Sequence, residues 1–370
     1  MELEKTIAGL IKIPSLSTHE RNLADYIFTT LVVAGIKPIK QSGNIVVKVK
    51  GKNSDKAIIF DAHMDTISPG ALSRWDYPPY GNDAGIKNGD KIFGLGASDN
   101  KCSIAVLMKL AQELKHKTPE IDVWLIFACE EEIGGNGTKR FLEWFETQGH
   151  MNKYYEISAV VCEPTDMEEI QLGHRGNFNA QITIKGKSGH GSEPHEVKNQ
   201  AIFAMMEIIK ELGKLEKAWS KKYSDNVLGS PTIAITSINA GEFISPNKFP
   251  DSCSITIDVR TTKKLDKIAF ELIKKCIDKF NAEIKLIYYS APPGYTSPEE
   301  KIALAGKKLV GKVHVGKVST DLCFFSEQNI PGIILGPGTN VAIHKPNEYC
   351  ELKKMEKGLV IYKKLIGLIS

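Results

Sequence analysis

The spacing of apolar residues divides the chain into three segments. From residue 1 to about 174, helical patterns at 3–10, 23–31 and 104–114 alternate with short apolar runs. Ser17 and Glu20 form a capping-box pattern before the second of these helices. The apolar runs are AIIF at 57–60, VWLIFA at 123–128 and ISAVV at 157–161. Buried strands that alternate with helices predict an α/β fold with a mostly parallel sheet, sandwiched by helices.

The segment from about 175 to 288 has a different pattern. Two helices, expected at 199–212 and 265–280, separate four strand-like runs in the order βαββαβ. This order predicts a ferredoxin-like domain, in which both helices cover one face of an antiparallel sheet. The strands are expected at 178–186, 231–238, 252–260 and 282–289.

The α/β pattern resumes after this segment. PGIILGPG at 331–338 predicts a strand and a turn, and residues 352–369 form a closing amphipathic helix. We therefore expect 1–174 and 289–370 to form one catalytic domain, with 175–288 inserted into it. A chain of 370 residues is long enough for two domains.

Composition excludes several classes of function. The net charge is only +4, from 48 basic and 44 acidic residues, so nucleic-acid binding is not expected. No apolar run approaches the length of a membrane span, and MELEKTIAGL at the N-terminus does not resemble a signal peptide. The seven cysteines contain no CxxC pair and are expected to be reduced. These features together indicate a cytoplasmic protein.

Acidic residues and histidines follow several of the predicted strands. Because the carboxyl ends of parallel strands meet at one edge of a sheet, we expect these side chains to lie close together. The residues are His63, Asp65, Asp99, Glu130, Glu131, Glu132, Glu163 and His344.

Such a cluster needs positive charge. Buried carboxylates repel one another, and metal ions neutralise them at the lowest cost. Histidine and carboxylate ligands without thiolates suit zinc, with cobalt or manganese as substitutes, and so many carboxylates favour two ions. Taken singly, each motif has a simpler explanation: a surface turn for H-x-D, a solvated helix start for the Glu run, a loop for Glu-Pro.

Five motifs occur in the order of a known family. They are FDAHMDT, GLGASDNK, CEEEIGGNGT, VCEPT and AIHKPNEY, and they extend over nearly the whole chain. The chain resembles the co-catalytic zinc hydrolases that include acetylornithine deacetylase, succinyl-diaminopimelate desuccinylase, aminoacylase and carboxypeptidase G. The resemblance implies that Asp99 bridges two metals. His63 and Glu163 would complete one site, and Glu132 and His344 the other.

The resemblance also implies catalytic roles next to the metals. Glu131 would be the general base, and Asp65 would orient His63 through its second ring nitrogen. The glycines and Thr after Glu132 align with the family's residues after its metal-binding Glu, which decides the register of the triple Glu. A cis peptide is implied directly after Asp99.

Substrate groups are expected in the inserted domain. His190 matches a family histidine that reaches into the partner subunit's active site, where it would bind the developing oxyanion; a locally bonded loop histidine is the alternative. Arg260 is placed to bind a substrate carboxylate, with an ion pair to Asp258 as the alternative. Asn247 resembles a substrate-facing asparagine.

Gly336 and Gly338 are candidates to offer backbone N–H groups to the substrate carboxylate, unless they form a plain turn. The expected function is removal of an acetyl or succinyl group from an amino-acid derivative. A metallo-dipeptidase or carboxypeptidase of the same family is the alternative, and an inactive sensor of amino-acid derivatives belongs to a different class. A homodimer through the inserted domain is expected, because open sheet edges are usually covered.

Overall fold

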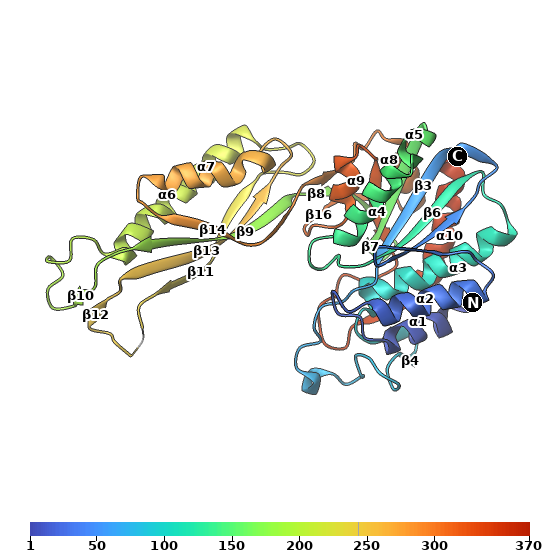
Figure 1. The fold of residues 1–370 in the computed structure, drawn as a ribbon, viewed down its shortest axis with the longest axis horizontal. Coiled ribbons are helices and arrows are strands. Elements are labelled where there is room, and N and C mark those ends of the chain that lie inside the picture. The colour runs from blue at the N-terminus through green and yellow to red at the C-terminus, as the bar shows by residue number, and fades with distance from the viewer. Residues whose placement is uncertain (243) are drawn as a thin grey trace. The chain divides into compact units, whose positions relative to one another are not determined.

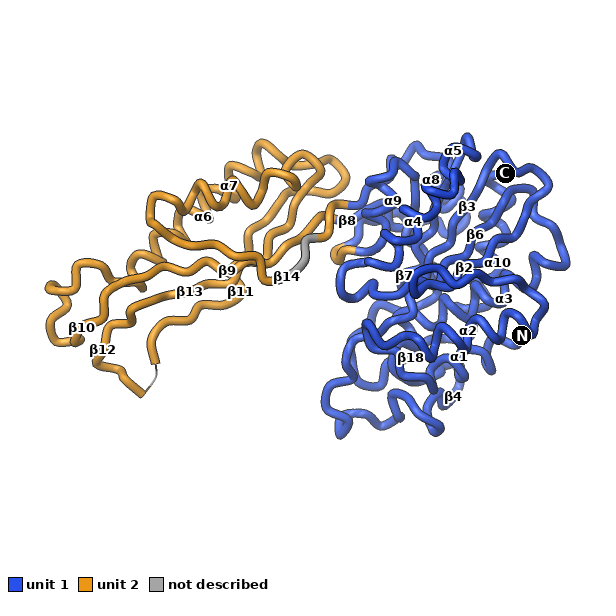
Figure 2. Tube along the Cα trace, viewed as in Figure 1, with its two compact units in different colours: residues 1–174, 294–316, 320–370 blue, residues 175–293, 317–319 orange. Residues whose placement is uncertain are grey.

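The structure, a computed structural model, describes residues 1–242 and 244–370, and of 288–290 it describes the backbone alone. The chain forms two compact units (Figure 2). The main segment of the second unit continues to Pro293, past the expected boundary at 288, because its last strand continues to Ala291. The first unit comprises Met1–His174, Gly294–Gly316 and Thr320–Ser370, and the second comprises Arg175–Pro293 and Lys317–Ser319.

A nine-stranded sheet forms the centre of the first unit. Its strands are β1 (Ile39–Gln41), β2 (Asn44–Val49), β3 (Asn53–His63), β6 (Ile121–Ala128), β7 (Glu156–Pro164), β8 (Glu169–His174), β15 (Gly294–Tyr295), β16 (Lys312–Gly316) and β17 (Gly332–Gly336). Their order is β1-β2-β6-β3-β7-β17-β8-β15, with β16 also paired to β8. The four central strands β6, β3, β7 and β17 are parallel, so their carboxyl ends share one edge. A small sheet of β4 (Ile86–Asn88), β5 (Lys91–Phe93) and β18 (Tyr349–Glu351) is separate.

Helices cover both faces of this sheet (Figure 1). Alternate residues of β3 point to opposite faces, so Ile58 and Phe60 belong to one core cluster and Ala57 and Ile59 to another. The first face packs against α1 (Leu3–Lys12), α2 (Arg21–Val33), α3 (Cys102–His116), α8 (Lys301–Val310) and α10 (Leu352–Ile369). The second packs against α4 (Asn136–Thr147) and α9 (Leu322–Glu327), with the short α5 (His150–Lys153) beside α4. The predicted α/β sandwich is confirmed. Among the helices of residues 1–242 and 244–370, none combines the length with the apolar character that a membrane span requires.

The expected capping box before α2 is wrong. The helix begins at Arg21 without a side-chain cap. The Ser17 hydroxyl instead donates to Asp65 Oδ2 at 2.8 Å, and the Glu20 carboxylate accepts from the Glu130 N–H at 3.0 Å. Both side chains serve residues that are distant in sequence.

The second unit has the ferredoxin-like order that the sequence predicts. Its antiparallel sheet follows the order β11-β13-β9-β14, and α6 and α7 both cover one face (Figure 1). The helix α6 continues to Lys222, ten residues beyond the expected end at 212. The elements are β9 (Gly176–Lys185), β10 (Gly189–His190), α6 (Ala201–Lys222), β11 (Thr232–Ala240), β12 (Lys248–Phe249), β13 (Ser252–Thr261), α7 (Asp266–Asp278) and β14 (Glu283–Ala291).

Candidate metal centre

The ends of the central strands deliver the predicted ligands to one edge of the first unit's sheet. His63 is the last residue of β3, and Glu163 lies at the end of β7. Glu132 follows β6, and His344 lies on the segment after β17. Asp99 lies in the short helical turn η2 (Ala97–Lys101), and its peptide bond to Asn100 is cis, as the resemblance implied.

The Asp99 carboxylate lies between the two histidines. His63 Nε2 is 2.9 Å from Oδ1 of Asp99, and His344 Nε2 is 3.4 Å from Oδ2. Glu163 Oε1 is 3.5 Å from His63 Nε2, and Glu132 Oε1 is 3.1 Å from His344 Nε2. Two groups of three potential ligands therefore share Asp99, and the ligand atoms within each group lie within 4.8 Å of one another.

These separations fit metal coordination. Two ligand atoms that each lie about 2.0–2.1 Å from a tetrahedral zinc ion are roughly 3.3 Å from one another. The four distances from the histidine nitrogens to the carboxylate oxygens range from 2.9 to 3.5 Å. Each group provides one imidazole and two carboxylates and contains no thiolate, a donor set that suits zinc or a similar divalent ion.

Without a cation, the electrostatics of this cluster are unfavourable. Burial raises the pKa of Glu163 well above its usual value, and the nearby Asp99 carboxylate raises it further. Burial opposes the charged form of His63, but the carboxylates of Glu163 and Asp65 outweigh it and raise the pKa of this imidazole well above its usual range. Hydrogen bonds to Asp99 and Glu132 raise the pKa of His344 to about 10. Protons thus compensate the negative charge in the metal-free protein, and divalent ions would replace them.

Asp65 supports the centre through more contacts than the sequence indicated. Its backbone carbonyl accepts from His63 Nδ1 at 3.0 Å, while its carboxylate lies 3.4 Å from the same nitrogen. The carboxylate also accepts from the N–H groups of Glu131 and Glu132, both at 3.0 Å. Asp65 therefore holds the segment that carries the predicted base and ligand. Burial raises the pKa of Glu131 well above its usual value.

Further residues beside the centre make contacts that the sequence did not predict. The Asn100 amide donates to Glu163 Oε1 at 3.0 Å, and only its place after the bridging Asp99 pointed to such a contact. The Thr138 hydroxyl lies 2.8 Å from Asp61 Oδ2 and 2.6 Å from Asp321 Oδ2. One hydroxyl proton serves only one of these buried carboxylates, and burial raises the pKa of Asp321 to about 6. No local pattern links these three residues.

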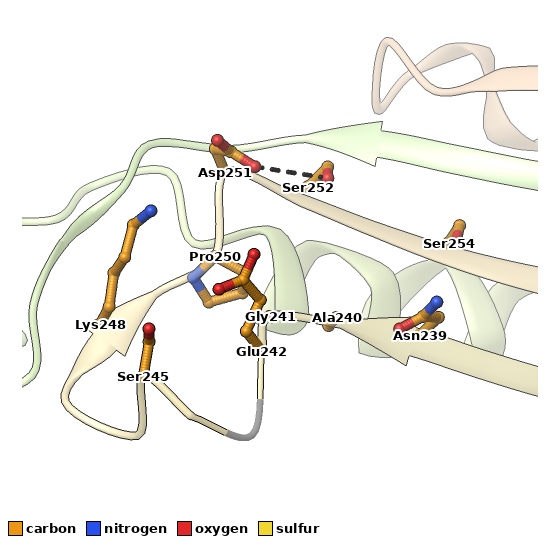
Figure 3. A pocket seen from close by; sticks show the side chains of 10 residues that line it. All are labelled: Asn239, Ala240, Gly241, Glu242, Ser245, Lys248, Pro250, Asp251, Ser252 and Ser254. Carbon is orange, nitrogen blue, oxygen red and sulfur yellow. Dashed lines mark hydrogen bonds between the residues drawn. The ribbon is translucent and has the colours of Figure 1, made fainter.

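Two of the predicted substrate residues lie together in the second unit. The Asn247 amide is 3.3 Å from His190 Nε2, and the Ser192 hydroxyl is 2.7 Å from His190 Nδ1. His190 therefore also makes the local bond that was its alternative explanation. Lys248 pairs with His190 in the β10–β12 ladder and lines a polar cavity of about 310 Å³ (Figure 3).

The other predicted substrate groups have partners within the protein. Arg260 donates to Asp258 through Nε at 2.7 Å and Nη2 at 2.9 Å, as its alternative explanation required. The Gly336 N–H donates to the Thr165 hydroxyl at 3.1 Å, so it already has an acceptor within the protein, and its role toward a substrate stays a prediction. A Cβ at Gly336 would lie 2.2 Å from the Cys162 carbonyl oxygen, so this glycine permits close strand packing. The role of Gly338 stays a prediction.

Comparisons with known proteins agree with this geometry. Residues 59–367 match the model of peptidase family M20/M25/M40. A peptidase M20 domain-containing protein of Schizosaccharomyces pombe is 28% identical over 97% of this chain and 82% of its own length. Acetylornithine deacetylase of Aliivibrio fischeri is 26% identical over 88% of this chain and 85% of its own.

A solved structure supports the fold. An M20 family metallo-carboxypeptidase from Sulfolobus solfataricus superposes with a TM-score of 0.79 over 100% of this chain and 99% of that one, at 21% identity. The resemblance drawn from the five motifs is thereby confirmed. With the family match extending over most of its length, the chain belongs to peptidase family M20/M25/M40 and is a metallo-hydrolase of that family.

Proposed function

We propose that this metallo-hydrolase uses two zinc ions to remove an N-acyl group, acetyl or succinyl, from a small amino-acid derivative. The observation that carries the proposal is the Asp99 carboxylate, whose two oxygens face the Nε2 atoms of His63 and His344. His63, Asp99 and Glu163 would hold one ion, and Asp99, Glu132 and His344 the other. When bound, zinc polarises a carbonyl group and lowers the pKa of water.

Glu131 is the proposed general base. The Glu131 backbone N–H donates to the Asp65 carboxylate, and this bond fixes the Glu131 backbone next to the two ligand groups. Its carboxylate takes a proton from the attacking water and transfers that proton to the amide nitrogen as the C–N bond breaks. Burial favours proton uptake by this carboxylate.

Groups of the second unit are proposed to bind the substrate. The contact between His190 and Asn247 supports a joint role in binding the oxyanion. The His190 imidazole would stabilise the oxyanion, and the Asn247 amide would orient the imidazole. Arg260 is proposed to bind the substrate carboxylate, which requires that carboxylate to join or displace Asp258.

The first experiment combines metal analysis with a substrate panel. Acetyl-, succinyl- and aminoacyl-amino acids are supplied with the zinc-loaded and the cobalt-loaded protein. Turnover of the acetyl- and succinyl-amino acids supports the deacylase. Selective turnover of the aminoacyl-amino acids supports the dipeptidase, which the similarity to a carboxypeptidase also allows. Two bound zinc ions without turnover of any substrate would instead favour a sensor.

The role of Glu131 has a matched control in the adjacent residue. Glu131→Gln is expected to retain both metals and lose at least about 100-fold in kcat. Glu130→Gln removes a neighbouring carboxylate that pairs with Arg140 at 3.3 Å, and it is expected to keep most of the activity. Near wild-type turnover by Glu131→Gln would refute the assignment.

We also propose a cytoplasmic homodimer formed through the second unit. Seven free thiols support a reducing compartment. Exposed apolar side chains support the interface: Phe203 on α6 is 62% exposed, and Ile238 on the edge strand β11 is 59% exposed. Sedimentation showing an active monomer would refute the dimer.

A complementation experiment tests whether His190 acts across subunits. His190→Ala and Glu131→Gln are each expected to be inactive as homodimers. If His190 serves the partner's site, random mixing would recover about one quarter of wild-type activity, because half of the dimers contain one complete site. No recovery after verified subunit exchange would show that His190 does not act in this way.

A further inference from the structure

Glu348 is a buried carboxylate that contacts the loop carrying Asp99. The Glu348 residue is only 2% exposed. Its Oε2 accepts a hydrogen bond from the Gly96 N–H at 2.9 Å. Its Oε1 accepts from the N–H groups of Ser98 at 2.8 Å and Asp99 at 2.9 Å.

The conformation of this loop explains why three N–H groups point to one carboxylate. Gly96 has a positive φ of 76°, and Asp99 departs from helical geometry with φ −126° and ψ 88°. The N–H groups of Gly96, Ser98 and Asp99 converge in this loop and form a concave site for an anion. Glu348 fills this site from a segment that is remote in sequence, and without it three buried donors would lose their acceptor.

Further bonds tie this loop to the segment that carries His344. The Gly94 N–H donates to the Glu348 carbonyl at 2.9 Å. The Ser98 hydroxyl donates to the Thr339 carbonyl at 3.1 Å. Thr339 and Glu348 lie on either side of His344 in the sequence, so the loop is attached to this segment on both sides of the histidine.

We propose that Glu348 is a positioning residue that sets the place of the Asp99 carboxylate relative to His344 and thereby controls the affinity of both metal sites. This inference rests on the proposed function, because it needs the two ligand groups to bind metal. Asp99 belongs to both groups, so a displaced Asp99 weakens both sites. Loss of a ligand found in one group, such as Glu163, removes a ligand from that group alone.

Zinc affinity tests this inference without reference to catalysis. Glu348→Gln places an amide NH₂ against backbone donors, so at least one of these N–H groups loses its acceptor. We expect both zinc dissociation constants, measured by competition with a chromophoric chelator, to rise about 10–100-fold. The d–d absorption spectrum of the cobalt-loaded variant should also change. Glu351→Gln is the matched control, because Glu351 pairs with Lys354 at 2.9 Å, outside the loop.

Several outcomes separate the possibilities. A folded Glu348→Gln protein that binds both zinc ions with wild-type affinity overturns the inference, and so does weakening of a single site. If the glutamine variant does not fold, Glu348→Asp keeps the carboxyl group at a shorter reach and should weaken both sites by a smaller factor. A wild-type protein that binds no zinc overturns the proposed function, and this inference with it.

Discussion

Replacing Asp65 by Asn tests whether this side chain organises the catalytic segment. The substitution preserves shape but replaces one acceptor oxygen by an NH₂ group. In the native protein the carboxylate accepts from the Ser17 hydroxyl and from the N–H groups of Glu131 and Glu132. The Ser17 hydroxyl can reverse its role and accept a bond, but a backbone N–H cannot.

The expected loss of stability follows from these three bonds. Whichever way the amide turns, one backbone N–H of Glu131 or Glu132 loses its acceptor, at a cost of about 1–3 kcal/mol. The remaining bonds change from charge-assisted to neutral, which costs about 0.5–1 kcal/mol each. We therefore expect the metal-free Asp65→Asn protein to lose roughly 2–5 kcal/mol of unfolding free energy.

Activity should fall as well, because the segment that holds the base and a ligand loses its anchor. We expect about 10–100-fold weaker zinc binding or lower kcat. Urea unfolding of the metal-free protein and kinetics at saturating zinc measure the two effects. Asp25→Asn is the control, because Asp25 forms exposed ion pairs with Lys40 and Arg21, and it should match wild type in both assays. An Asp65→Asn protein with wild-type urea midpoint and kcat would refute the reasoning.

Three further predictions concern other parts of the molecule. Asp122 is buried, and although burial alone would raise its pKa, hydrogen bonds from Gly51 and Tyr154 lower it to about 2. Its carboxylate therefore stabilises the fold above the unfolded-state pKa of about 4 and loses this effect as pH falls toward about 2. The stability gap between wild type and Asp122→Asn, measured by urea unfolding, should close over that interval, and a gap independent of pH would contradict the assignment. The Asn347 carboxamide accepts from the N–H groups of Asp76 and Tyr77 at 2.7 and 3.2 Å. Asn347→Ala should therefore speed hydrogen exchange in residues 70–77 with little change in Tm. Unchanged exchange would show that the loop does not depend on this contact. Arg260→Lys keeps the positive charge but loses the planar guanidinium group with its two parallel N–H donors. If Arg260 binds the substrate, KM should rise more than kcat falls. Unchanged kinetics would leave Arg260 as the ion-pair partner of Asp258.

The cluster of candidate metal ligands could be predicted because its signal is local. The strands β3, β6 and β7 each contain a continuous apolar run, and a histidine or acidic residue of the candidate site follows within a few residues of its end. Parallel strands place those residues at one edge, so His63, Glu132 and Glu163 could be grouped without coordinates. The choice of Glu132 among the three consecutive glutamates depended on the family motifs. In the structure, Glu132 Oε1 lies 3.1 Å from His344 Nε2.

The supporting contacts could not be predicted in this way. Ser17 and Glu20 have the spacing of a capping box, but their side chains bond Asp65 and the Glu130 N–H. A hydroxyl or carboxylate bonds whichever donor or acceptor the folded chain brings near, and a local motif does not specify that partner.

The sequence by itself therefore determined the two-part α/β and ferredoxin-like architecture and, with the family motifs, indicated the candidate ligand set. Hydrophobic periodicity and strand-end position are properties of short segments, which is why they can be seen without coordinates. Only the tertiary structure decided which groups hold those ligands in place, such as Glu348 beneath the Asp99 loop. It also decided that the Gly336 N–H is used internally. The physical reason is that buried donors and acceptors must be paired across long sequence distances, and only the folded chain defines those pairs.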